Sequence, residues 1–309
     1  MNRCPITYEP LAEGVDYSVE GLRLLDRNLR SLARLEFTAE EQRHEAISRV
    51  GKMSVQGTQL KLSAVLRIKQ GRFEVVDCSG RFILKPPSLD YPELPANEDV
   101  TMRMAAAAGI EVPLHGLLWA ADGSLTYFIK RFDRPGRHRL PLEDFAQLAG
   151  ESRETKYSSS MEKVAGVVDR LCTFPVLERI KLFERTLFSF LVGNEDMHLK
   201  NFSLITRAGK VELAPAYDFL NSTIALPNPQ EELALPLNGK KSKLTRNDLL
   251  RYFARERLHL NEAVLADVLV RFREAVPQWR RLLERSFLSS AMKEKFLLLL
   301  EGRAQRSLA

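Results

Sequence analysis

The stretch Gly193–Phe202, GNEDMHLKNF, contains an acid and an amide five residues apart, at Asp196 and Asn201. It follows a long apolar helical pattern, Pro175–Val192, and precedes a short predicted hairpin, so we expect it to form a loop. In a loop, this spacing can direct two side chains to one point. A carboxylate there can accept a hydroxyl proton, and an amide oxygen can ligate Mg²⁺. The stretch is therefore the first candidate for a site of chemistry.

The same D-x-x-x-x-N spacing occurs in the catalytic loop of protein kinases. Asp218, seventeen residues beyond Asn201, comes just after a predicted strand, in the segment Pro215–Phe219 (PAYDF). A second acid at that place corresponds to the other Mg²⁺ ligand of kinases. The order of these residues after a β-rich first half predicts a site for phosphoryl transfer.

A lysine at the end of a predicted strand, Lys85 in RFILK, is the candidate phosphate ligand of the first half of the chain. Glu98, near the start of a predicted helix, could orient Lys85 through an ion pair, or could serve only as a favourable acid at a helix N-terminus. The polar run Ser54–Ser63 contains Gly57, and its backbone N–H groups could bind phosphates, although it lacks a GxGxxG pattern. Phe128–Phe132 (FIKRF) ends the last strand of this half, where backbone groups could bind adenine.

The order of the predicted elements indicates an α+β fold with two lobes. Thr38–Glu41 (TAEE) fits a capping box that opens a helix to about Val50. Strands are predicted at Ala64–Lys69, Phe73–Asp77, Arg81–Lys85, Leu114–Ala120 and Leu125–Arg131, with a helix at Glu98–Ala108. Helices are predicted at Glu143–Ala149, Ser160–Leu171, Pro175–Val192, Arg246–Arg257, Asn261–Ala275 and Val276–Leu300, and a hairpin at Asn201–Thr206 and Lys210–Ala214. We therefore expect a β-rich N-lobe over residues 1–132 and, over residues 133–309, a C-lobe that is all-helical apart from the short hairpin.

Composition excludes several classes of protein. The 309 residues are 45% apolar and 28% charged, which is typical of a globular chain. Cys4, Cys78 and Cys172 are too few and too far apart for a disulfide framework or a CxxC metal site, so we expect a reducing compartment, the cytoplasm. The opening residues have no signal-peptide pattern, and no apolar run is long enough to span a bilayer. The net charge of +6 permits nucleic-acid contact, but the basic runs Arg134–Arg139 and Lys240–Lys243 lack interleaved aromatics.

Seven short segments together resemble a known family. They are Ser54–Lys61 (SVQGTQLK), Ile83–Lys85, Asn97–Glu98, Lys130–Arg134, Glu143–Phe145, Gly193–Asn201 and Tyr217–Asp218. They are similar to the corresponding segments of HipA-type serine/threonine kinase toxins of bacterial toxin–antitoxin systems. The resemblance covers about residues 50–300. It implies a two-lobed protein-kinase-like fold and the cofactors ATP and Mg²⁺.

The resemblance also implies roles for individual residues. Asp196 would be the catalytic base, and Asn201 and Asp218 would hold Mg²⁺. The implied ATP-binding residues are Gln56, Gly57, Thr58, Gln59, Leu60 and Lys61 in the phosphate loop, Lys85 on the phosphates, Lys130, Arg131 and Phe132 at adenine, and His198, Leu199, Lys200, Asn201, Tyr217 and Asp218 in the second half. Ser54 matches the serine whose autophosphorylation silences the kinase. From the residues alone, His198 could equally be a structural hydrogen bonder and Ser54 an ordinary turn residue.

The resemblance implies partners as well. The substrate would be a cellular protein, in the family's pattern an aminoacyl-tRNA synthetase whose phosphorylation halts translation and growth. Only about fifty residues precede the phosphate loop, as in a short form whose missing N-terminal subdomain is supplied by a separate small antitoxin. A DNA-binding antitoxin would be a second partner, with DNA contacted only through it, and no membrane is expected. Two departures stand out: Leu220 follows Phe219 where kinases have glycine, and Lys130 occupies a position where long forms often have Glu.

Two other functions remain open from the sequence. A small-molecule kinase of the aminoglycoside-phosphotransferase type shares the D-x-x-x-x-N loop, but would need an acidic pocket for a cationic sugar. An inactive pseudokinase that serves as partner of a DNA-binding antitoxin would not need the metal and phosphate residues, all of which are present. Transfer of phosphate from ATP distinguishes these possibilities.

Overall fold

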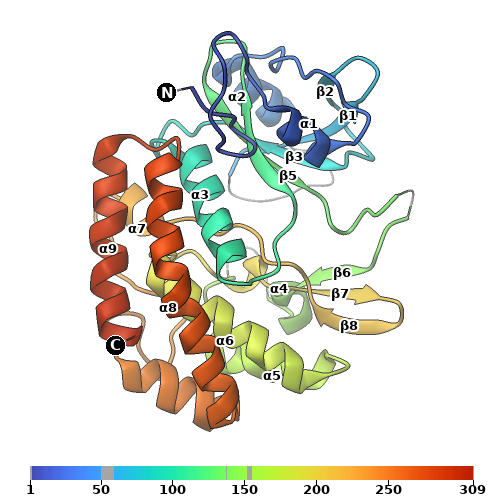
Figure 1. Cartoon of the computed structure of the whole chain (residues 1–309). Helices are drawn as coiled ribbons and strands as arrows, with labels where there is room; N and C mark the ends of the chain where they lie inside the picture. The colour runs from blue at the N-terminus through green and yellow to red at the C-terminus, as the bar shows by residue number, and fades with distance from the viewer. Residues whose placement is uncertain (1, 50–58, 137, 152–154, 309) are drawn as a thin grey trace. The chain divides into compact units, whose positions relative to one another are not determined.

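In the computed structural model, residues 2–49, 59–136, 138–151 and 155–308 are described, and contacts divide the chain into two units (Figure 1). Unit 1 consists of Met1–Asp99, Pro113–Phe132 and Arg285–Leu288. Unit 2 consists of Val100–Val112, Asp133–Glu284 and Ser289–Ala309. Each unit has its own sheet.

The described part of unit 1 contains a five-stranded antiparallel sheet with the strand order β2-β1-β3-β5-β4. Its strands are β1 (Leu62–Arg67), β2 (Arg72–Val75), β3 (Phe82–Lys85), β4 (His115–Trp119) and β5 (Leu125–Lys130). The predicted strands are confirmed with small shifts of their ends. The turn between β1 and β2 contains Gly71, whose φ of +60° and close approach to the backbone of Ser31 leave no room for a side chain.

An aromatic cluster forms the centre of the unit 1 core. Phe73 packs edge-on against Phe82 with 5.0 Å between ring centroids, and both contact Phe128. Leucines of the N-terminal residues, including those of α1 (Val19–Leu25), pack into the same cluster. The helix α2 (Ala39–Ser48) begins with the predicted capping box, in which Thr38 and Glu41 bind each other's backbone N–H groups.

The described part of unit 2 contains a three-stranded antiparallel sheet in the order β6-β7-β8. The predicted hairpin is confirmed as β7 (Ser203–Arg207) and β8 (Lys210–Leu213), whereas β6 (Leu142–Asp144) was not predicted. The expectation of a helix from Glu143 is wrong by two residues. Asp144 is the N-cap of α4 (Phe145–Ala149) and accepts the Gln147 N–H, so the helix begins only after the strand.

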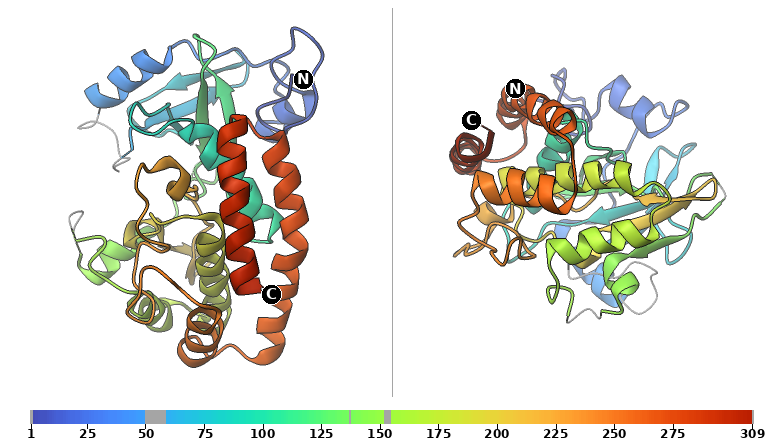
Figure 2. Two further views of the ribbon diagram at one scale, coloured as in Figure 1. Left: turned by 90° about the vertical axis from the view of Figure 1, so that its left-hand side faces the viewer. Right: turned by 90° about the horizontal axis from the view of Figure 1, so that it is seen from below.

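Helices make up most of unit 2. They are α5 (Met161–Leu171), α6 (Pro175–Val192), α7 (Ser222–Ala225), the 3₁₀ turn η1 (Leu199–Asn201), the π-helical segment η2 (Asn247–Arg257), most of α8 (Glu262–Arg285), α9 (Ser290–Leu308), and the second half of α3 (Leu94–Ala107). Figures 1 and 2 show α8 and α9 side by side, and an ion pair of 2.8 Å joins Arg280 to Glu301 between them. None of the described helices is long and apolar enough to cross a membrane.

The division of α8 differs from the sequence prediction. We expected one helix to end at Ala275 and another to begin at Val276, but α8 continues through Pro277 to Arg285. Buried aromatic side chains anchor the helix on both sides of the proline. Trp279 donates from its indole nitrogen to the Met104 carbonyl at 2.8 Å and packs edge-on against Phe272. This packing offsets the hydrogen bond that proline removes from the helix.

Candidate active site

The loop predicted from GNEDMHLKNF begins where α6 ends, at Gly193. This glycine has φ +77°, and a Cβ there would lie 2.7 Å from Asn221 Oδ1. The Gly193 carbonyl accepts the hydroxyls of Ser222 (3.2 Å) and Thr223 (3.0 Å) at the start of α7. Asn221 caps α7 by accepting the Ile224 N–H at 3.1 Å. The entry to the loop is therefore fixed by direct contacts with α7.

Hydrogen bonds inside the loop hold the two predicted residues together. Asn201 donates its amide nitrogen to the Asp196 carbonyl at 2.8 Å, and the His198 N–H donates to the same oxygen at 2.8 Å. The Asp196 N–H in turn donates to Asn194 Oδ1 at 3.2 Å. The side chain of Asp196 is 44% exposed, whereas Asn201 is buried. The loop thus presents a carboxylate to solvent beside a fixed amide.

Two adjacent residues before α5 contact this loop, and the sequence analysis missed both. The Tyr157 hydroxyl donates to the Asp196 carboxylate, and Lys156 Nζ lies 2.7 Å from His198 Nε2. The rings of Tyr157 and His198 meet edge to face at 5.0 Å. These partners are about forty residues apart in sequence, so no helical or strand period relates them.

The pKa of His198 is lowered from its ordinary value, chiefly because burial disfavours the charged ring. The Asp196 charge acts in the opposite direction, and the Lys156 charge adds to the lowering. A neutral ring can accept a hydrogen bond from the Lys156 ammonium through Nε2. His198 therefore has a structural contact of its own, whether or not it also contacts a ligand.

We expect protonation of His198 to reduce stability in acid. In the unfolded chain the histidine binds its proton near pH 6.5, about the ordinary pKa, whereas the folded protein disfavours the protonated ring. The free energy of unfolding therefore falls as the pH drops below about 6.5. Urea unfolding of wild type and His198→Gln between pH 5 and 8 measures this dependence. The matched control is His44→Gln, because His44 is exposed on α2. Equal pH dependence in wild type and His198→Gln would contradict the prediction.

Asp218 is held next to the loop by its neighbour. The Tyr217 hydroxyl donates to the Lys200 carbonyl at 3.0 Å and lies 2.5 Å from Ser203 Oγ. Burial raises the pKa of Tyr217, which keeps the phenol protonated. Asp218 is near enough to His198 for its negative charge to raise the pKa of that ring. The structure therefore brings the three predicted acid and amide residues to one part of unit 2.

Asn201 and Asp218 fit the ligand chemistry of Mg²⁺. The amide nitrogen of Asn201 is engaged with the loop carbonyl, so its oxygen is the atom that could ligate a cation. Asp218 supplies carboxylate oxygens, which Mg²⁺ prefers. Among the described residues no cluster of three His, Cys, Asp or Glu side chains could hold a metal ion. Mg²⁺ usually takes one or two protein oxygens and completes its shell with water and substrate phosphates, so the small donor set agrees with it.

Other predicted residues of unit 2 have different surroundings. The Lys200 ammonium pairs with the Asp144 carboxylate at 2.6 Å, at the point where β6 meets α4. Leu199 is 1% exposed and belongs to the core. Their predicted contacts with ATP stay predictions.

Unit 1 carries the predicted lysine and its partner. Lys85 Nζ lies 2.6 Å from Glu98 Oε1, and both side chains are almost completely buried, at 3% and 0% exposure. The predicted ion pair is thus confirmed. Lys85 Nζ also lies 5.5 Å from the centre of the Tyr127 ring, its cross-strand neighbour on β5. A buried ammonium held in this way has a fixed position.

The other described site residues predicted in unit 1 lie at or next to the ends of strands. Gln59, Leu60 and Lys61 are half-buried just before β1. Lys130 is exposed at the end of β5, and Arg131 and Phe132 follow it, half-buried. Ser54, Gln56, Gly57 and Thr58 lie outside the described residues.

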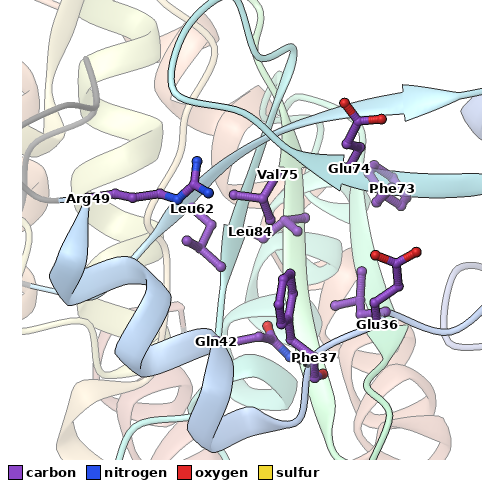
Figure 3. Close-up of a pocket in the computed structure, with 10 residues that line it drawn as sticks. Glu36, Phe37, Gln42, Arg49, Leu62, Phe73, Glu74, Val75 and Leu84 are labelled. Carbon is purple, nitrogen blue, oxygen red and sulfur yellow. Dashed lines mark hydrogen bonds between the residues drawn. The ribbon is translucent and has the colours of Figure 1, made fainter.

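The described part of unit 1 contains a pocket of about 170 Å³ (Figure 3). It is lined by Leu35, Glu36, Phe37, Gln42, Arg49, Leu62, Phe73, Glu74, Val75 and Leu84. Figure 3 shows apolar side chains of β1–β3, together with Gln42 of α2 and Arg49, which directly follows α2. None of these described lining residues is a predicted site residue.

An antiparallel sheet with a buried Lys–Glu ion pair, and a helical unit with an ordered D-x-x-x-x-N loop, together define a protein-kinase-like fold. The chain belongs to the HipA-like C-terminal domain family, which matches residues 53–280. This confirms the resemblance seen in the sequence.

Individual relatives agree with this assignment. A protein named "Putative kinase" from Haemophilus influenzae is 31% identical over 262 residues, which are 78% of this chain and 75% of that protein. The serine/threonine-protein kinase toxin HipA of Shewanella oneidensis is 28% identical over 216 residues, 61% of this chain and 47% of the toxin. The chain spans 48% and 59% of two further "Putative kinase" relatives from Sinorhizobium fredii.

Solved structures confirm the fold. The HipA toxin of Shewanella oneidensis, solved in complex with HipB and operator DNA, superposes with a TM-score of 0.71 at 22% identity. The match covers 96% of this chain and 80% of that one. The proinflammatory kinase CtkA of Helicobacter pylori gives a TM-score of 0.54 at 16% identity, over 74% of this chain and 87% of CtkA. At these identities the similarity shows the fold alone.

Proposed function

We propose that this chain is an ATP- and Mg²⁺-dependent protein serine/threonine kinase that acts as a toxin. The observation that supports it most is the ordered catalytic loop: Asn201 binds the Asp196 backbone, and Tyr217 holds Asp218 beside it. The named activity of the Shewanella oneidensis relative supports the choice of a protein hydroxyl as acceptor.

In this proposal each residue has a defined task. Asp196 accepts the proton of the acceptor hydroxyl, and its exposed carboxylate can reach a substrate. Asn201 and Asp218 would hold Mg²⁺, which supplies neutralisation of the phosphate charge. Lys85, oriented by Glu98, would bind the α- and β-phosphates. Most of the catalysis is positioning and electrostatic stabilisation.

The remaining predictions belong to the same proposal. The nucleotide would also contact Gln56, Gly57, Thr58, Gln59, Leu60, Lys61, Lys130, Arg131, Phe132, His198, Leu199, Lys200 and Tyr217. Ser54 would be autophosphorylated and thereby silence the kinase, since a phosphoryl group adds negative charge beside the triphosphate. We propose an N-lobe over residues 1–132 and a C-lobe over residues 133–309.

For partners, we propose an aminoacyl-tRNA synthetase as the protein substrate, so that phosphorylation halts translation and growth in the cytoplasm. A DNA-binding antitoxin would be a regulatory partner, because the Shewanella oneidensis HipA structure contains HipB and operator DNA. A separate small antitoxin, similar to the N-terminal subdomain of long forms, would be a second regulatory partner.

The test is phosphoryl transfer by the purified full chain. With [γ-³²P]ATP and Mg²⁺ we expect label on the protein itself and on a protein of a bacterial lysate, and no label when EDTA removes the metal. Phosphopeptide mass spectrometry after induced expression then identifies the acceptor. Label on an aminoglycoside but on no protein would support the small-molecule kinase instead, and no transfer with intact ATP would support the pseudokinase.

A further inference from the structure

We propose that a buried cluster of Tyr8, Asp99 and His115 positions Glu98, and through it Lys85, for binding ATP phosphates. We call these three residues the Asp99 cluster. The inference rests on the proposed function and adds positioning residues that lie outside every kinase motif in the chain.

Asp99 is the centre of the cluster and immediately follows Glu98 in α3. It is 0% exposed, and each of its carboxylate oxygens has a partner within unit 1. The Tyr8 hydroxyl donates to Oδ2 at 2.6 Å, and His115 Nδ1 lies 2.8 Å from Oδ1. Tyr8 comes from the N-terminal residues and His115 from β4, so two separate parts of unit 1 hold one carboxylate.

Holding Asp99 also sets the direction of Glu98. Successive residues of an α-helix point about 100° apart around its axis, because a turn contains 3.6 residues. A rotation of the first turns of α3 that swings Glu98 away from Lys85 must also pull Asp99 away from its two partners. The contacts of Asp99 therefore oppose the motion that would break the Lys85–Glu98 ion pair of 2.6 Å.

The Tyr127 ring also lies near both His115 and Lys85. The centroid of the His115 ring lies 5.9 Å from that of the Tyr127 ring, and Lys85 Nζ lies 5.5 Å from the centre of the same Tyr127 ring. Tyr127 is 0% exposed and is paired with Lys85 across β3 and β5. The cluster and the ion pair thus share a packed aromatic ring.

The backbone at Tyr8 is strained, which indicates a constraint on this residue. Its φ is +64°, a conformation that is rare for a bulky side chain and persists only when the surroundings enforce it. The Tyr8 N–H donates to the Cys4 carbonyl at 2.8 Å, and Leu117 on β4 donates to the Pro5 carbonyl at 3.2 Å. The Tyr8 ring packs edge-on against Phe287 at 5.6 Å. The N-terminal turn therefore holds the Tyr8 hydroxyl in hydrogen-bonding distance of Asp99.

Stability alone does not account for a charged cluster at this place. Replacing buried ionic groups with apolar residues of similar size is often neutral or stabilising. An apolar trio could fill the same space, but it would not fix the rotation of α3 with hydrogen bonds of defined direction. This favours a positioning role for the Asp99 cluster.

The test is Tyr8→Phe, which removes one hydroxyl and keeps the ring that packs on Phe287. We expect KM and Kd for ATP to rise about tenfold, since a hydrogen bond to a charged group is lost, while kcat and the KM for the protein substrate change little. The matched control is Tyr17→Phe. Tyr17 is also a buried tyrosine of unit 1, and its hydroxyl accepts the N–H of Trp119 on β4 at 2.9 Å. We expect it to lose stability to a similar extent and to keep the wild-type KM and Kd for ATP.

A double-mutant cycle shows whether Tyr8 acts through Glu98. In a Glu98→Gln background, Tyr8→Phe should have little further effect on ATP affinity. A full additional tenfold loss there would overturn the inference, as would wild-type ATP affinity for Tyr8→Phe in an active enzyme. Wild-type protein that neither binds nor uses ATP would instead overturn the proposed function itself. If Glu98→Gln does not fold, the ATP affinities of Tyr8→Phe and Tyr17→Phe test the inference on their own, and equal affinities would overturn it.

Discussion

Replacing Asp196 with asparagine is expected to lower the rate of phosphoryl transfer by about 10²- to 10⁴-fold, the range for loss of a general base. The amide has nearly the same shape, and its oxygen can still accept the Tyr157 hydroxyl, so the loop should keep its structure. It cannot accept a proton from the acceptor. We therefore expect unchanged ATP affinity by calorimetry and a large loss of kcat.

The matched control for this variant is Asp169→Asn. Asp169 lies on α5 in the same unit and forms a partly exposed ion pair with Arg179 at 2.6 Å. The Asp169→Asn variant should transfer phosphate at the wild-type rate. Near-wild-type kcat for Asp196→Asn would show that another group accepts the proton.

Replacing Asp218 with asparagine is expected to lower transfer about 10³-fold at ordinary Mg²⁺ concentrations, because metal stabilisation of the transferring phosphate is worth several kcal/mol. Asparagine is the informative choice. Asp218 has φ +58°, which asparagine tolerates, whereas alanine would add backbone strain to the loss of a ligand. Titration of activity with Mg²⁺ should show a much higher requirement in the variant.

Glu212→Gln is the control for charge removal near this position. Glu212 lies on β8 and contacts Arg207 of the neighbouring strand β7 at 3.3 Å, and both side chains are partly exposed. The Glu212→Gln variant should keep the wild-type dependence of activity on Mg²⁺ concentration. An unchanged Mg²⁺ requirement in Asp218→Asn would remove Asp218 from the metal site.

The sequence predicted those parts of the fold that follow from local chemistry. The unit 1 sheet could be predicted because its short strand-like runs are separated by turn residues such as Gly71. The loop Gly193–Phe202 could be predicted because Asp196 and Asn201 are close in sequence. The break assigned at Ala275 was wrong because only tertiary packing of Trp279 shows that α8 continues.

Long-range contacts were beyond such reasoning. Tyr157 and Asp196 are 39 residues apart, and Tyr8 and Asp99 are 91 residues apart. No period connects residues at these separations, and tyrosine is common in ordinary cores. The sequence predicted the Lys85–Glu98 pair from the order of kinase elements, but it contained no signal for the side chains that hold this pair in place.

The close packing at the entry to the loop Gly193–Phe202 has a consequence for how this family can vary. Gly193 and Asn221 come from separate helices, yet a Cβ at one would lie 2.7 Å from the amide oxygen of the other. A side chain at position 193 would be strained at a φ of +77° even if position 221 were smaller, and a smaller residue at 221 removes the cap of α7. Glycine at 193 and asparagine at 221 should therefore be inherited together, because no change at one position compensates for the loss of the other.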